Sequence, residues 1–282
     1  MQQAIDAVFA IGAAGYITAA GFAGMFLGSG NRRLLAPLVY ALVVGGVCLV
    51  FTFGMRCFMW RRLPLTTAGD ALNLLVLLAT AAVLPIARKE RAAALLSFYA
   101  PALAALYAAN GLFFRESLRT APRLLRGGPL LAHVGMAFLA YALLLLAGVT
   151  SVAYVLLARR LKRGDTTGLF QHLPSLEELD RSLWGFVRRG YALFSATLLV
   201  GVAWAWLERD LLGDRWWISP KVSLSFVMVI FYAVCFHARR SGWLRGPRLA
   251  YWVLVGFALL FGLYVALELA GLRTYHFWGE TG

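Results

Sequence analysis

Eight long apolar stretches constrain this chain more than any other feature of its sequence. They cover about 4–28, 34–58, 68–87, 92–114, 130–158, 190–207, 219–238 and 248–271. Each is close to the roughly 20 residues that an α-helix needs to cross a bilayer. The chain is 61% hydrophobic with a mean hydropathy of +0.73, which is more apolar surface than a soluble domain of this length can bury. We therefore predict an all-α, polytopic integral membrane protein with about eight transmembrane helices.

A polar insert, about 164–189, separates the fifth and sixth apolar stretches. Ser175 followed three positions later by Glu178 matches a capping box, and we expect a short amphipathic helix along the inner membrane surface with Trp184 as its interfacial anchor. The first stretch has no basic leader and is long enough to span, so we expect it to stay as a helix rather than act as a cleaved signal. With no internal repeat, residues 1–282 are expected to form a single membrane domain.

We interpret the net charge of +14 as an indication of membrane orientation and of contact with anionic lipid. No soluble basic domain is present to bind nucleic acid, whereas excess arginine in a membrane protein marks cytoplasmic loops and contacts anionic lipid. Placing both termini outside puts most basic residues in inner loops, around 32–33, 88–91, 159–189 and 239–248. We predict this orientation in a bacterial cytoplasmic membrane. Asp70 is expected to pair with Arg61 or Arg62, and Glu268 with an outer arginine.

No catalytic motif is found in the sequence. There is no HExxH, no phosphate-cradling glycine loop and no serine nucleophile with a partnered histidine. The missing nucleotide motifs argue against nucleotide-driven transport by this chain alone. The cysteines Cys48, Cys57 and Cys235 form no CxxC pair and lie in or near apolar runs, so we interpret them as packing residues.

Tryptophans gather in one loop, about 204–221, that lies between two apolar stretches and therefore at a membrane surface. Four of the nine tryptophans are found there: Trp204, Trp206, Trp216 and Trp217. An aromatic belt is the ordinary explanation for interfacial tryptophans, and it accounts for Trp60, Trp243 and Trp252. It accounts less well for the adjacent pair between Arg215 and Pro220, which would also provide a flat platform for a large planar ligand such as haem.

Histidines are placed around this loop. His133 opens the fifth stretch and His276 lies in the tail, both on the predicted face of the tryptophan loop, and together they could supply two axial nitrogens to a haem iron. His237 ends the seventh stretch on the opposite face. Taken singly, His133 is also explained by an interfacial hydrogen bond, His237 by a helix end beside basic anchors, and His276 and His172 by solvation.

The basic residues Arg215, Lys221 and Arg273 could pair with haem propionates or could be membrane anchors.

Several of these segments resemble the haem-handling family of cytochrome c assembly proteins, which includes CcsA or ResC, CcmC and HemX. The likeness lies in Arg215-Trp216-Trp217-Ile218-Ser219-Pro220-Lys221, in Phe236-His237-Ala238-Arg239 at a helix end, and in Gly242-Trp243-Leu244-Arg245-Gly246. Arg62-Leu63-Pro64-Leu65, Leu131-Ala132-His133-Val134 and Leu173-Pro174-Ser175-Leu176-Glu177 match in kind and in order. Ser219 and Val222 replace the aspartate and glutamate usual in the family, which favours a HemX-like or divergent CcsA member.

The resemblance implies a cofactor and partners. His133 and His276 would ligate non-covalent haem b over the tryptophan loop, and His237 would hold haem within the membrane. The partners implied are a CcsB-like membrane protein and apocytochrome c. The chain would be at most a subunit of a haem-attachment system, without catalytic residues of its own.

Two other functions stay open at this stage. One is a haem-independent scaffold, or a regulator of haem synthesis, that keeps the fold and acts through a partner protein. The other is a small-solute transporter, which requires helices interrupted at mid-span in corresponding halves. Pro85 and Pro101 are expected near span ends, which argues against the transporter.

Overall fold

The computed structural model describes residues 2–60, 68–88, 92–113, 128–164, 173–209, 216–218 and 220–262. Every regular element within these ranges is helical, which confirms the predicted all-α class. The α-helices are α1 (Gln2–Ser29), α2 (Leu35–Trp60), α3 (Ala68–Val83), α4 (Leu96–Phe113), α5 (Gly128–Lys162), α6 (Leu176–Leu207), α8 (Pro220–Arg240) and α9 (Pro247–Phe257). Shorter 3-10 segments are η1 (Arg32–Leu34), η2 (Leu84–Arg88), η3 (Ala92–Leu95) and η6 (Trp216–Ile218), and the π-helical η7 (Ala258–Gly262) continues α9.

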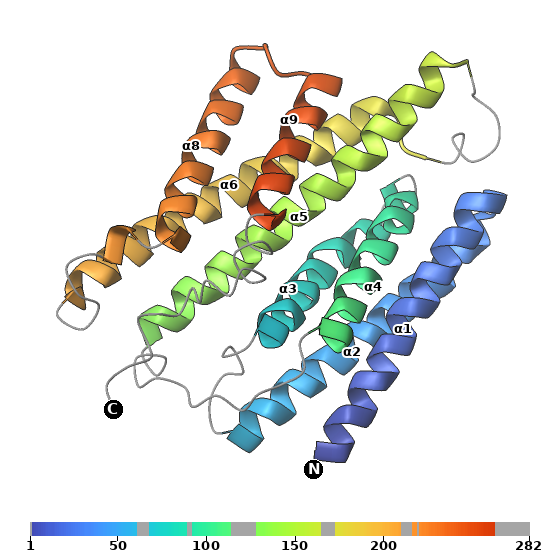
Figure 1. Ribbon diagram of the computed structural model, residues 1–282. Helices are drawn as coiled ribbons and strands as arrows, with labels where there is room; N and C mark the ends of the chain where they lie inside the picture. The colour runs from blue at the N-terminus through green and yellow to red at the C-terminus, as the bar shows by residue number, and fades with distance from the viewer. Residues whose placement is uncertain are drawn as a thin grey trace.

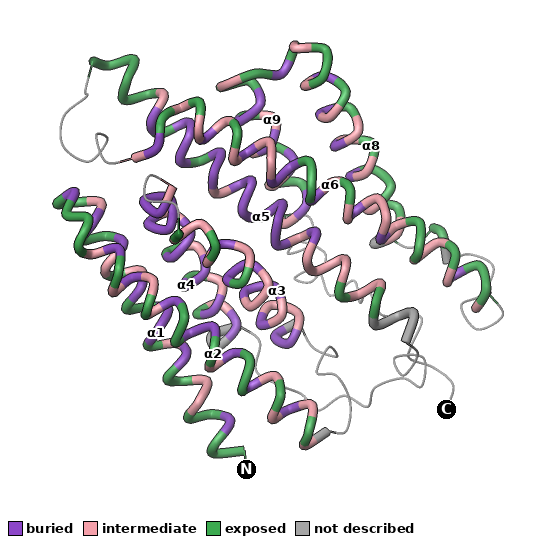
Figure 2. Tube along the Cα trace, turned by 180° about the vertical axis from the view of Figure 1, so that it is seen from behind, coloured by how far each residue is buried: buried purple, intermediate pink, exposed green. Residues whose placement is uncertain are grey.

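The long helix α5 lies in the middle of the bundle. Helices α1 to α4 lie on one side of it, and α6, α8 and α9 lie on the other (Figure 1). Along its most apolar stretch 72% of the residues of α5 are buried, against 22% in both α6 and α8. The outward faces of the flanking helices stay exposed (Figure 2), and α5 is therefore the element around which the two groups pack.

Seven of the described helices are long and apolar enough to cross a membrane, and an eighth, shorter apolar helix covers Pro247–Gly262. This agrees with the predicted spans, the last of which is described only as far as Gly262. Apolar side chains such as Tyr40, Phe51 and Leu199 are 62–72% exposed, as expected for surfaces that face lipid rather than water. The protein is a multi-pass membrane protein.

Glycines allow the closest helix contacts. A β-carbon at Gly190 of α6 would lie 2.9 Å from Leu144 Cδ2 of α5, and one at Gly256 of α9 would lie 2.6 Å from Phe231 Cε1 of α8. Both distances are shorter than real side chains tolerate. Small residues at such crossings let backbones approach, which is how helices associate when lipid removes the hydrophobic driving force between them.

Helix α6 corrects the predicted insert. Its first half was expected to be a separate amphipathic helix, but a single helix runs from Leu176 to Leu207. The capping box is confirmed, because the Ser175 hydroxyl accepts from the Glu178 backbone N–H and the Glu178 carboxylate accepts from the Ser175 N–H. Buried residues recur at helical spacing across the supposed boundary: Leu179, Leu183, Phe186, Val187, Gly190, Phe194 and Thr197. This unbroken apolar stripe keeps the helix continuous.

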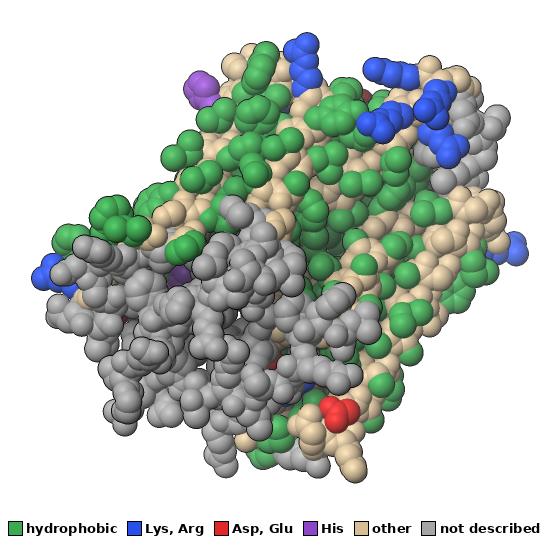
Figure 3. Space-filling model, in the orientation of Figure 1, with side chains coloured by type: hydrophobic (Ala, Val, Ile, Leu, Met, Phe, Trp, Pro, Cys, Tyr) green, Lys and Arg blue, Asp and Glu red, His purple; other side chains and the backbone are tan. Residues whose placement is uncertain are grey.

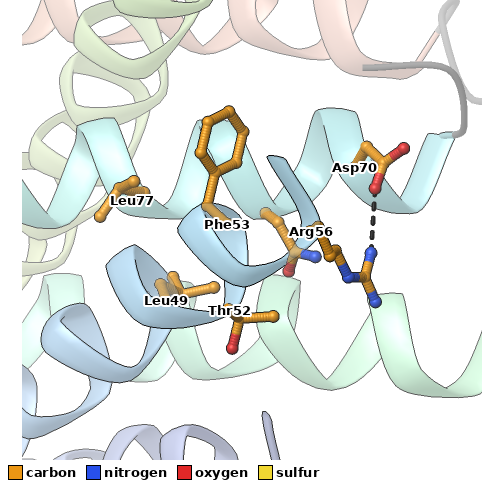
Figure 4. Close-up of a pocket in the computed structure, with 7 residues that line it drawn as sticks. Leu49, Thr52, Phe53, Arg56, Asp70 and Leu77 are labelled. Carbon is orange, nitrogen blue, oxygen red and sulfur yellow. Dashed lines mark hydrogen bonds and ion pairs between the residues drawn. The ribbon is translucent and has the colours of Figure 1, made fainter. Parts of the chain in front are cut away.

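A buried ion pair joins α2 and α3. Arg56 Nη1 donates to Asp70 Oδ1 at 2.9 Å, and the two side chains are 9% and 1% exposed (Figure 4). The expected partners of Asp70, Arg61 and Arg62, lie outside the described residues. Arg56 reaches Asp70 because α2 and α3 are antiparallel, which brings the last turns of α2 level with the first turn of α3.

Amides extend this polar cluster to a third helix. Asn110 of α4 donates to Asn73 of α3 at 2.7 Å, and both side chains are buried. Asn73 also lines the small cavity between α2 and α3 together with Arg56 and Asp70. Three helices are thus tied at one level by polar contacts that water does not reach.

Pro85 and Pro101, whose expected positions near span ends argued against a transporter, occupy different kinds of position in the structure. Pro85 lies in η2 after the end of α3, as expected, but Pro101 lies inside α4. A proline inside a helix removes one backbone hydrogen bond. Pro101 is the tenth of the 19 residues of the apolar span Ala92–Asn110, so it lies at mid-span and not near a span end as expected.

Breaking the buried pair should destabilise the fold. Asp70→Leu leaves the Arg56 guanidinium buried without its carboxylate and should cost about 3 kcal/mol, whereas the double variant Arg56→Leu/Asp70→Leu should cost less than either single change. Thermal unfolding of the detergent-purified protein measures both effects. Asp6→Asn, at an exposed carboxylate on α1, is the matched control and should leave the midpoint unchanged. A destabilisation of the double variant equal to the sum of the two single effects would contradict a direct coupling between Arg56 and Asp70.

Candidate functional site

The bundle has two distinct ends. The first, called here the His133 end, contains the start of α5, the end of α6, η6 and the start of α8 (Figure 1). The second, called here the arginine-rich end, contains the end of α5, the start of α6, the end of α8 and the start of α9. Lys and Arg side chains gather at the upper end of the molecule in Figure 3. Exposed basic residues of the arginine-rich end are Arg159, Arg160, Lys162, Arg163, Arg181, Arg188, Arg189, Arg240, Arg245 and Arg248.

His133 lies against the backbone of α6. It is half-buried in the second turn of α5, and its Nδ1 is 3.0 Å from the backbone carbonyl oxygen of Thr197. A carbonyl oxygen can only accept, so Nδ1 carries the hydrogen. In a neutral imidazole with that tautomer, Nε2 carries the lone pair. This is the arrangement in which metal-binding histidines are commonly held.

Gly201 provides the room for this contact. A β-carbon at position 201 would lie 2.5 Å from His133 Cε1 and 3.0 Å from Nδ1. Trp204 follows Thr197 by seven residues, or about two helical turns, and so lies on nearly the same side of α6. The structure therefore brings His133 and Trp204 onto one side of α6, as expected from their predicted common face.

The tryptophans are only partly in a loop. Trp204 and Trp206 belong to the last turns of α6, which corrects their assignment to a loop over about 204–221. Two residues apart on a helix, they point in nearly opposite directions, so they do not form one flat platform. Trp206 is 63% exposed, with the Arg209 guanidinium 5.5 Å from its ring centre. Trp217, in η6, is 58% exposed.

His237 lies at the opposite end. It occupies the last turn of α8, about 25 Å along the helix axis from Pro220, and its side chain is exposed. An open groove of about 570 Å³ surrounds it, lined by Ala233, Val234, His237, Ala238, Ser241 and Trp243. His133 and His237 therefore cannot reach the same metal ion, which agrees with their predicted placement on opposite faces.

A polar clamp holds the turn next to His237. Arg239 Nη2 donates to Asp180 Oδ2 at 2.5 Å, and Arg239 Nη1 donates to the Leu244 carbonyl at 3.1 Å. The Asp180 carboxylate also accepts from the Gly246 backbone N–H at 3.2 Å. One carboxylate of α6 thus fixes the end of α8 and the start of α9.

Aromatic rings support the same clamp. The centres of the Trp184 and Phe236 rings are 5.3 Å apart. The Arg239 guanidinium lies 5.8 Å from the centre of the Trp184 ring. Trp184 thus packs between α6 and α8, and its expected role as an interfacial anchor stays a prediction. Sequence reasoning had assigned no role to Asp180, because its partners come from a segment about 60 residues away.

The remaining predicted site residues lie outside the described part of the chain. These are Arg215, Arg273 and His276, and the side chains of Trp216 and Lys221 are not described either. Within the described ranges, no three His, Cys, Asp or Glu side chains gather to hold a bare metal ion. An iron held in a porphyrin makes a smaller demand, since its protein ligands are axial only. A single exposed or half-buried histidine at each end fits that demand.

The sequence matches a known family over most of its length. The family model described as cytochrome C assembly protein matches residues 65–271. This region includes α3 to α9, with both His133 and His237. No solved structure matches the chain.

Individual relatives are more distant. The chain is 24% identical over 173 residues to the cytochrome c biogenesis protein CcsA of Solanum lycopersicum, covering 52% of this chain and 54% of that protein. It is 26% identical over 176 residues to CcsA of Prochlorococcus marinus (strain MIT 9515), covering 54% of each. It is 28% identical over 147 residues to the protein HemX of Bacillus subtilis (strain 168), covering 52% of this chain and 51% of that protein. The chain spans about half the length of the curated relatives it matches.

Removing the clamp should loosen the α8–α9 turn. Asp180→Ala deletes the acceptor for Arg239 and for the Gly246 N–H, and hydrogen bonds to charged groups contribute about 2 kcal/mol. We expect faster hydrogen–deuterium exchange in residues 240–250, measured by mass spectrometry. Glu177→Ala, which breaks the exposed Glu177–Arg181 pair one turn away, is the control and should leave that exchange unchanged. Equal exchange in both variants would show that the clamp does not hold the turn.

Proposed function

This chain belongs to the cytochrome c assembly protein family, and we propose that it binds non-covalent haem b and presents it at the His133 end for cytochrome c biogenesis. The observation that carries the proposal is the position of His133. Its Nδ1 is held against the Thr197 carbonyl of α6, on the side of α6 that also bears Trp204, and we propose that its Nε2 ligates the iron. When bound, the haem supplies the redox-active iron and the groups to which an apocytochrome's cysteines attach.

The protein contributes binding and orientation. His133 provides one axial nitrogen, and His276 in the tail is proposed as the second. The exposed ring of Trp217 near this end and Trp216 beside it in the sequence are proposed as the flat apolar surface for the porphyrin. Arg215, Lys221 and Arg273 are proposed as partners for the propionates, through charge-assisted hydrogen bonds.

His237 is proposed as a separate haem position at the other end. Its groove is open and mostly apolar, and Trp243 on one side is 58% exposed. A ligand entering from the membrane would meet this groove without crossing the bundle. The clamp between Asp180 and Arg239 keeps the α8–α9 turn, and with it Trp243, in place beside the histidine.

We propose that the arginine-rich end faces the cytoplasm. Described residues at the arginine-rich end carry many exposed basic side chains, and such ends face the cytoplasm in bacterial inner membranes. The His133 end then faces outward, where cytochromes c mature. A CcsB-like membrane protein and an apocytochrome c are the partners that this arrangement would serve.

Optical spectra test the proposal directly. The full-length protein, purified in detergent from haem-replete cells, should show sharp b-type bands after reduction with dithionite. His133→Ala and His276→Ala should each remove the low-spin signal of the outer site, and His237→Ala should retain it. His172→Ala, a histidine in the polar insert with no proposed ligand role, is the matched control.

Two results would contradict the proposal. Loss of the bands in His237→Ala alone would restrict haem to the membrane groove. A wild-type protein without bands would exclude haem carriage and leave the alternative of a scaffold, or a regulator of haem synthesis, that acts through a partner protein. In that case, co-purification with a second membrane protein becomes the decisive measurement.

A further inference from the structure

Several glycines in the described residues leave room for a neighbouring side chain, and at some of them that neighbour carries a polar group, as at Gly12, where the Tyr107 hydroxyl is 2.8 Å from the position of a β-carbon. Where Gly148, Gly190 and Gly256 admit Phe257, Leu144 and Phe231, the neighbour is an apolar ring or chain and the result is tight packing. At Gly201 the neighbour is an imidazole, with His133 Cε1, Nδ1 and Nε2 at 2.5, 3.0 and 3.4 Å from the position of a β-carbon. The missing side chain therefore makes room for a functional group.

The geometry of a helix explains why this glycine matters. The carbonyl of residue 197 points toward residue 201, with which it shares the ordinary helical hydrogen bond. A side chain at 201 would cover that carbonyl from the direction of α5. With glycine there, the imidazole reaches the carbonyl and shares it, at 3.0 Å from Nδ1.

We infer that the Thr197 carbonyl and Gly201 form a notch that fixes the tautomer and ring plane of His133, which makes Gly201 a positioning residue for Nε2. Both parts of the notch are backbone of α6, so neither can rotate away as a side chain could. The Nδ1–H donates to the Thr197 carbonyl, and the Cε1 edge of the ring lies over Gly201, with Nε2 at 3.4 Å from the position of a β-carbon there. The consequence for haem rests on the proposed function, but the state of the imidazole does not.

The Thr197 side chain plays no part in this contact. Its hydroxyl Oγ1 is buried and has no hydrogen-bond partner among the described residues, and the contact to His133 is made by the backbone oxygen. Thr197→Val keeps the volume of the side chain and the carbonyl. This variant therefore distinguishes a contact of His133 with the backbone carbonyl from a contact with the Thr197 hydroxyl.

The first test needs no haem. Nitrogen-15 NMR of the full-length protein, labelled at its four histidines and assigned with His133→Gln, reports which ring nitrogen carries hydrogen. We expect His133 to be in the Nδ1–H form in the wild type and in Thr197→Val, and to lose it in Gly201→Ala. A wild-type His133 in the Nε2–H form, or averaging between the two, would overturn the notch whether or not the glycine variant folds.

The second test uses the haem-loaded protein. Mutation of a group that supports a metal ligand typically lowers metal affinity by about 10- to 100-fold. Gly201→Ala should therefore weaken haem binding by at least about tenfold. It should also shift the haem spectrum from low spin toward high spin. Added imidazole should restore the low-spin spectrum. Gly190→Ala is the packing control, since it also forces a close contact on α6, with Leu144 Cδ2 at 2.9 Å, where no histidine is involved.

The outcomes separate the two proposals. Wild-type haem affinity and spectrum in Gly201→Ala would overturn the notch and leave haem binding intact. Equal spectral changes in Gly190→Ala and Gly201→Ala would assign the effect to helix packing and also overturn it. Absence of haem from every variant, with the Nδ1–H form present in wild type and lost in Gly201→Ala, would contradict the haem proposal and support the notch.

Discussion

Close approach between helices is the constraint on which this structure depends. Lipid is as apolar as the side chains that face it, so burial alone does not bring membrane helices together, and packing has to do so. The central helix α5 meets α6 at Gly190 and α9 at Gly148, and α9 meets α8 at Gly256. These contacts set the spacing within the half of the bundle that carries both histidines. A fourth close approach, at Gly201, uses the same physics for a polar group.

Most of the fold could be predicted from the sequence because the length of each apolar run is itself the signal. The errors arose where tertiary contacts decide. The start of α6 was expected to lie apart as an amphipathic helix, but its buried stripe continues through Gly190 into the apolar half. The pair between Arg56 and Asp70 was not predicted, because it depends on the antiparallel pairing of α2 and α3, which brings Arg56 to the level of Asp70. Neither result can be read from local composition.

The site was predictable in its residue types and less so in its geometry. His133 and His237 stood out because histidines are rare in apolar runs, and their placement at opposite ends followed from counting spans. Trp204 and Trp206 were assigned to a loop, whereas α6 continues past both of them and ends at Leu207. Thr197 and Gly201 gave no signal at all: a backbone carbonyl and a missing side chain become functional only when another helix is placed against them.

The continuity of α6 has a mechanical consequence. Asp180 and Gly201 lie on one unbroken helix, about 32 Å apart along its axis, with the clamp to α8 near one end and the seat of the imidazole near the other. A helix without a hinge tilts or slides as a rod. Any displacement of the α8–α9 turn that pulls on Asp180 would therefore move the carbonyl of Thr197 relative to α5. One continuous helix, α6, thus takes part in the contacts at both ends.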